Sequence, residues 1–66
     1  MSVARVTEIT SESGKDFETA IDNAIEKANK TLDQIEGAWV QDMKVTVKDG
    51  KVDKYRVNLK VTFVLK

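Results

Sequence analysis

Residues 55–66, YRVNLKVTFVLK, alternate between apolar and polar side chains over most of their length. In an extended strand, alternate side chains point to opposite faces. The odd-numbered positions form an apolar face that comprises Tyr55, Val57, Leu59, Val61, Phe63 and Leu65. The other face carries Arg56, Asn58, Lys60 and Thr62. A period of two predicts a strand that packs one face against a core.

A second alternating segment, MKVTVK at residues 43–48, precedes this strand. Its apolar face comprises Met43, Val45 and Val47. Between the two strands, KDGK at 48–51 contains the Asp-Gly pair that favours a tight turn, so we expect an antiparallel hairpin with coinciding apolar faces. Val40 is out of phase with Met43, which predicts a bulge, or a late start of the strand, within residues 40–42.

An amphipathic helix is predicted from the segment that precedes the hairpin. Ser13 and Asp16 have a spacing close to that of a capping box. Apolar side chains then recur at helical spacing: Phe17, Ala20, Ile21, Ala24, Ile25, Ala28, Leu32 and Ile35. Gly37 follows as the expected C-terminal stop. The predicted helix is about five turns long, and we expect it to cover the apolar face of the hairpin.

Residues 3–10, VARVTEIT, are rich in β-branched residues and predict a first strand. Val6 and Ile9 fall on opposite faces, which indicates a bulge or an edge strand. The predicted fold is therefore α+β, with the order β-α-β-β and a three-stranded antiparallel sheet packed around one amphipathic helix. The length favours a single domain over residues 1–66.

The composition narrows the classes of function. The chain has no cysteine and no histidine, which excludes disulfides and thiolate or imidazole metal ligands. The remaining side chains form no constellation typical of a known catalytic mechanism, so we expect a protein that is not an enzyme. Eleven basic and eleven acidic residues balance, which argues against nucleic acid as a partner.

No apolar run is long enough to span a membrane, and no signal-peptide pattern is found at the N-terminus. We therefore expect a cytoplasmic protein without a membrane partner. The hydrophobic core of so short a chain rarely contributes more than about 3–5 kcal/mol to the free energy of unfolding. This small contribution favours oligomerisation.

Three groups of side chains are candidates for binding. The first group is an acidic stripe at helical spacing: Glu18, Asp22 and Glu26. It is either a hard-cation site completed by symmetry or a solvated helix face. The second group consists of basic side chains on the polar face of the hairpin: Lys44, Lys48, Lys54, Arg56 and Lys60. They form either an anion-binding surface or charges that keep the face soluble. Trp39 is either a platform for a flat ring or a side chain that covers the helix end or a subunit contact.

Two segments resemble the dodecin family. Residues 28–35, ANKTLDQI, are similar to the end of its helix, A-x-x-T-[LV] before a hydrophobic stop. Residues 55–65, YRVNLKVTFVL, are similar to its last strand, Q-V-x-x-K-V-x-F-x-L. The opening V-x-E-I-x-x-x-S and the helix start F-E-x-A also fit. The resemblance covers almost the whole chain and implies a hollow homododecamer that stores or sequesters flavins, such as FMN or riboflavin, without catalysis.

The resemblance also implies the cofactor-binding residues. With Ile35 and Val40 as anchors, the flavin-stacking tryptophan of the family corresponds to Gly37, and its flavin-contacting glutamine corresponds to Arg56. Trp39 falls where the family usually has an acidic residue. The candidates are therefore Gly37, Trp39 and Arg56, with Trp39 or Arg56 supplying the ring contact that glycine lacks. The alternative is a flavin-free shell that binds metal ions such as calcium or is purely structural.

Overall fold

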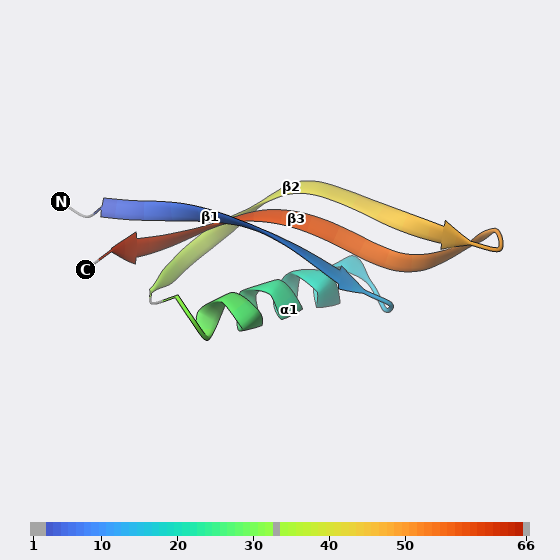
Figure 1. The fold of residues 1–66 in the computed structure, drawn as a ribbon, viewed down its shortest axis with the longest axis horizontal. Helices are drawn as coiled ribbons and strands as arrows, with labels where there is room; N and C mark the ends of the chain where they lie inside the picture. The colour runs from blue at the N-terminus through green and yellow to red at the C-terminus, as the bar shows by residue number, and fades with distance from the viewer. Residues whose placement is uncertain (1–2, 33, 66) are drawn as a thin grey trace.

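The computed structural model describes residues 3–32 and 34–65. Its elements follow in the order β1 (Val3–Ser13), α1 (Phe17–Asn29), β2 (Ile35–Lys48) and β3 (Lys51–Leu65) (Figure 1). The predicted β-α-β-β order is confirmed. Four residues that the sequence predictions included lie outside the described residues: Met1, Ser2, Asp33 and Lys66.

The three strands form one antiparallel sheet in the order β1-β3-β2. β3, the strand with the long alternating pattern, is central and pairs on both sides. β1 is an edge strand and pairs with β3 without a register shift from Val3 to Ser13. The edge-strand interpretation of the first segment is therefore confirmed, and the bulge alternative is wrong. Val6 lies on the face away from the helix, whereas Ile9 packs against the core.

A tight turn joins β2 to β3, as the Asp-Gly pair predicts. Asp49 and Gly50 have φ angles of 53° and 75°, and positive φ at both central residues is the requirement of a type I′ turn. The predicted bulge is also confirmed, because the register shifts between Val40 and Asp42 and makes Gln41 the extra residue.

The helix begins later than predicted. Asp16, not Ser13, is the N-cap, and its carboxylate accepts a hydrogen bond of 2.7 Å from the backbone N–H of Thr19. Ser13 is the last residue of β1, where it pairs with Tyr55. Because its backbone belongs to the sheet, the helix can start only after the chain has turned away from β3.

The helix also ends earlier than predicted. α1 stops at Asn29 with Lys30 as its C-cap, so the continuation to Ile35 and the stop at Gly37 are wrong. Ile35 and Gly37 both lie in β2. Leu32 and Ile35 contact the same core as the helix. The helical spacing of apolar residues therefore continues past the end of the helix itself.

All three strands are longer than predicted. β1 reaches Ser13 rather than residue 10, β2 starts at Ile35 rather than within residues 40–43, and β3 starts at Lys51 rather than residue 55. The added segments are mostly polar or out of phase. Backbone pairing with a neighbouring strand extends them where the hydrophobic pattern gives no signal.

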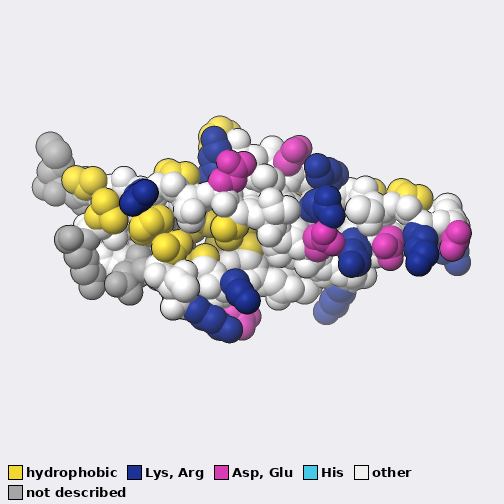
Figure 2. All heavy atoms as spheres, viewed as in Figure 1, with side chains coloured by type: hydrophobic (Ala, Val, Ile, Leu, Met, Phe, Trp, Pro, Cys, Tyr) yellow, Lys and Arg dark blue, Asp and Glu magenta, His cyan; other side chains and the backbone are white. Residues whose placement is uncertain are grey.

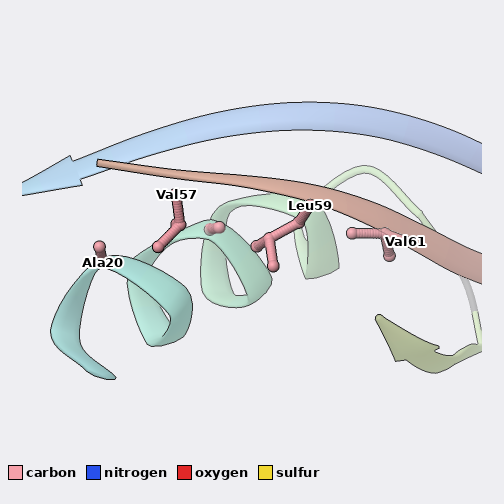
Figure 3. Packing of buried hydrophobic residues seen from close by; sticks show 5 residues of the cluster. Ala20, Val57, Leu59 and Val61 are labelled. Atoms are coloured by element: carbon pink, nitrogen blue, oxygen red, sulfur yellow. The ribbon is translucent and has the colours of Figure 1, made fainter. Parts of the chain in front are cut away.

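The core lies between α1 and the central strand. Val57, Leu59 and Val61 are fully buried and point from β3 toward the helix (Figure 3). Ala20 and Ala24 face them, and these small side chains allow the helix to approach the sheet closely. Half-buried apolar residues complete the cluster: Ile9, Phe17, Ile21, Ile25, Leu32, Ile35 and Val40.

The β2–β3 hairpin extends well beyond the helix (Figure 1). At about 1.5 Å per residue, α1 is about 20 Å long, whereas the molecule is 51 Å long. The apolar side chains of the outer half of the hairpin are consequently 40% to 64% exposed: Met43, Val45, Val47 and Val52. The expectation that the helix covers the whole apolar face of the hairpin is wrong for this half.

Candidate functional site

The three candidate residues share the face of the sheet that lies away from α1, here named the outer face. Directly paired residues of neighbouring strands point to the same face. Three transverse rows of the outer face contain the candidates: Val6–Thr62–Gly37, Glu8–Lys60–Trp39 and Glu12–Arg56–Lys44. The register therefore places the candidates along one surface, at different distances from each other.

Trp39 is 67% exposed on the outer face. The ammonium of Lys60, its partner on β3, lies 6.0 Å from the centroid of the indole ring, a cation–π distance. The interpretation in which Trp39 covers the helix end is wrong, because the helix packs on the opposite face of the sheet. Within the described protomer, most of the Trp39 side chain is exposed to solvent.

Gly37 lies two residues before Trp39 on the outer face, with no register shift between them. A strand rises about 3.3 Å per residue, so the two positions are about 7 Å apart. A Cβ atom built on Gly37 would have no heavy atom within 4 Å apart from those of Gly37 itself and its two chain neighbours. The space above Gly37 is therefore open, on the same face as Trp39.

Arg56 is held by a carboxylate of the edge strand. Its Nε donates a hydrogen bond of 3.2 Å to Oε1 of Glu12, and its Nη2 donates to the same oxygen. The second oxygen of Glu12 lies 3.8 Å from Nζ of Lys54. The hydrogen bond from Arg56, reinforced by the positive charges of Arg56 and Lys54, holds the pKa of Glu12 below its ordinary value.

The structure brings Gly37 and Trp39 together and places Arg56 apart from them. Arg56 is four residues from Lys60 along β3, which corresponds to about 13 Å. The outer face thus has an aromatic region, made of Gly37, Trp39 and Lys60, and an ionic region, made of Glu12, Lys44, Lys54 and Arg56. Acidic and basic side chains alternate along the hairpin end of the molecule, whereas apolar side chains gather toward the termini (Figure 2).

The other two candidate groups have different outcomes. The register confirms that the five predicted basic side chains share the polar face of the hairpin. On the helix, the acidic stripe of Glu18, Asp22 and Glu26 is exposed. Among residues 3–32 and 34–65, no three acidic side chains are arranged to hold a metal ion. In the same ranges, no helix is long and apolar enough to cross a membrane.

Sequence reasoning did not find Glu12 or the surroundings of Asn58. Glu12 meets Arg56 across 44 residues of sequence, through a register that local patterns do not encode. Asn58 lies between the two regions, with its Nδ2 3.5 Å from Oγ1 of Thr10. Its buried Oδ1 has no hydrogen-bond partner among the described residues. The alternation of β3 indicated which face Arg56 and Asn58 occupy but not what they contact.

Comparisons with known proteins match this architecture. The sequence model of one family, described as Dodecin, matches residues 3–66. The chain belongs to the dodecin family. Among curated proteins, no relative matches this dodecin.

Solved dodecin structures share the fold over nearly the whole chain. The dodecin from Streptomyces coelicolor is 31% identical, with a TM-score of 0.93, over 98% of this chain and 93% of that chain. An arginine-to-alanine mutant of the dodecin from Thermus thermophilus is 30% identical, with a TM-score of 0.95, over 100% and 98% of the two chains. The calcium dodecin of Mycobacterium tuberculosis, described as calcium-chelating with a novel calcium-binding site, is 32% identical, with a TM-score of 0.84, over 98% and 93%.

Proposed function

We propose that this dodecin binds and stores a flavin, FMN or riboflavin, as a non-catalytic homododecamer. The proposal rests on the exposed indole of Trp39, which lies on the same face of β2 as the open space over Gly37 and two residues from it. A flat ring that enters this space would lie against the indole. Stacking of a heteroaromatic ring on an aromatic side chain contributes about 1–3 kcal/mol, enough to replace the platform that the family resemblance assigns to position 37.

The ionic region supports a ligand with a polar or anionic tail. Arg56 and Lys44 are opposite each other on β3 and β2, about 13 Å along the sheet from the row of Trp39. A guanidinium matches the geometry of a phosphate better than an ammonium does. In this arrangement the ring of the ligand occupies the aromatic region and its tail extends toward Arg56.

The proposed homododecamer is supported by the apolar face of the hairpin half that extends beyond the helix. Four apolar side chains are exposed there in one protomer: Met43, Val45, Val47 and Val52. Contiguous exposed apolar surface is typical of a protein–protein interface. Contacts with further copies would bury this surface and would add stability to a core that is small on its own.

The test is a titration of FMN and of riboflavin with the purified protein, followed by flavin fluorescence. We expect saturable quenching at micromolar concentrations, because a ring stacked on an indole loses its emission. The visible absorbance of the protein as purified gives a second readout of flavin that is already bound. Full flavin emission at micromolar protein would reject the flavin proposal.

A flavin-free shell that binds calcium is the second candidate. It is favoured by the similarity to the calcium dodecin of M. tuberculosis and by the exposed stripe of Glu18, Asp22 and Glu26. Because no metal-holding group forms within the described part of one protomer, such a site would combine carboxylates from several copies. Calorimetry with calcium and magnesium, together with thermal melting in a chelator, tests it. No heat and an unchanged melting temperature would reject the candidate.

A further inference from the structure

We infer that Glu12 determines ligand specificity: it occupies the anion-binding edge of Arg56 and so weakens the binding of phosphorylated flavins relative to neutral ones. The inference rests on the proposed function, because it concerns the ligand of the same outer face. It assigns a role to a residue of the edge strand β1, whereas the flavin candidates lie on β2 and β3.

The geometry of the ion pair carries the argument. A guanidinium has five N–H donors, and its side edge binds a carboxylate or phosphate through two of them. In Arg56 that edge is made by Nε and Nη2, and both donate to Oε1 of Glu12. A ligand phosphate must therefore either displace Glu12 or approach Arg56 from its remaining donors, next to a negative charge.

The surrounding charges make the ionic region sensitive to this single carboxylate. Glu12 also contacts Lys54, and Lys44 lies directly across from Arg56 on β2. Neither of the two ion pairs found in the described part of the chain includes Lys44. Lys54 and Arg56 thus share the carboxylate of Glu12. Without Glu12 the three positive charges lose the carboxylate that pairs with Arg56, and a further carboxylate of the same face, that of Asp42, lies one row away, opposite Asn58.

The exposure of the pair permits a ligand to reach it. The side chains of Arg56 and Glu12 are 37% and 34% exposed. Solvent therefore reaches the pair and screens it, which limits the effect of one charge to a moderate change in affinity. At a separation of about 6 Å and a solvent-like dielectric, removal of one repulsive charge corresponds to about a 3- to 10-fold change in binding.

The test is a parallel titration of FMN and riboflavin with the wild type and Glu12→Gln. Glutamine keeps the size of the side chain and one acceptor oxygen for Arg56. We expect the Kd for FMN to fall about 3- to 10-fold while the Kd for riboflavin stays unchanged. In 1 M salt, where the Debye length is about 3 Å, the difference between the two variants should largely disappear.

Glu8→Gln is the matched control. Glu8 lies on the same strand and the same face as Glu12, opposite Lys60. Its substitution removes the same charge next to the aromatic region instead of the ionic region. We expect a smaller effect on FMN than that of Glu12→Gln. The double variant Glu12→Gln, Arg56→Gln measures the energetic coupling between the two side chains. Without the guanidinium, the substitution of Glu12 should change the Kd for FMN less.

The outcomes separate the inference from the proposed function. If both flavins bind but Glu12→Gln changes them equally, changes neither, or has no more effect than Glu8→Gln, the inference is overturned and flavin binding stands. If the wild type binds neither flavin, the proposed function fails and the inference fails with it.

Discussion

Trp39 and Gly37 lie two residues apart on one face of β2, with an unbroken register between them. The indole therefore stands about 7 Å along the strand from the position that the family resemblance assigns to the stacking ring. The glycine leaves that position open. Under the proposed function, the ring of a ligand would occupy the open position over Gly37 and stack on the indole of Trp39.

The first prediction concerns Trp39 itself. Trp39→Ala should weaken flavin binding about 10- to 100-fold, through the loss of stacking worth about 1–3 kcal/mol. Because the ring is 67% exposed, the melting temperature should change little. Flavin fluorescence titrations measure the affinity, and Trp39→Phe, which keeps a smaller ring, should give an intermediate value. Wild-type affinity in the alanine variant would contradict the assignment.

The second prediction concerns the open space over Gly37. Gly37→Val should fold at least as well as the wild type, because valine suits a strand and a Cβ there meets no neighbour within 4 Å. Its branched side chain should occupy the space beside the indole and weaken flavin binding by about 10-fold or more. Gly37→Ala fills less of the space and should retain more affinity. Equal affinities of wild type and Gly37→Val would show that the ring lies elsewhere.

The sequence predicts the parts of the fold that depend on neighbouring residues. The alternation of β3 and the Asp49-Gly50 pair identify the hairpin because strand period and turn conformation are local properties. The end of the helix, in contrast, is not determined by neighbouring residues alone. Leu32 and Ile35 keep the helical spacing because they pack on the same core, so the pattern alone cannot separate helix, loop and strand.

The candidate site also combines features that the local sequence predicts with contacts that depend on the whole sheet. Alternation predicts that Arg56 and the hairpin lysines share a polar face, and the structure confirms it. The contact between Arg56 and Glu12 depends on the pairing of β1 with β3 and on its register. Both are set by packing of the whole sheet. The positions of Gly37 and Trp39 on the outer face likewise depend on the bulge at Gln41, which shifts the register between Val40 and Asp42.

The third prediction uses the titration of the N-cap. Hydrogen bonds from Thr19 hold the pKa of Asp16 below its ordinary value of 3.8. A lowered pKa in the folded state means that the stabilisation is complete above the unfolded-state pKa and is lost as the pH falls through the folded-state pKa. Asp16→Asn keeps a capping oxygen but does not titrate. Urea denaturation should therefore show a smaller loss of stability between about pH 5 and pH 2 in this variant than in the wild type. Equal losses would contradict the capping role.

The fourth prediction concerns assembly through the uncovered hairpin. Light scattering of the wild type should give about twelve times 7.4 kDa, as the proposed homododecamer requires. Val45→Glu places a charge on the apolar face and should abolish the large species, because an unpaired charge is costly in an interface. Thr46→Glu adds the same charge on the opposite face of the same strand and should leave the assembly intact. A dodecamer that survives Val45→Glu would exclude this face as an interface.

The most direct test of the central claim is the emission of Trp39, the one tryptophan of the chain, during titration with riboflavin or FMN. If the ligand ring stacks on the indole, tryptophan emission should be quenched with saturation at micromolar concentrations. Its midpoint should equal the midpoint of flavin quenching. Flavin binding that leaves the emission of Trp39 unchanged would contradict the assignment of the ligand to the aromatic region.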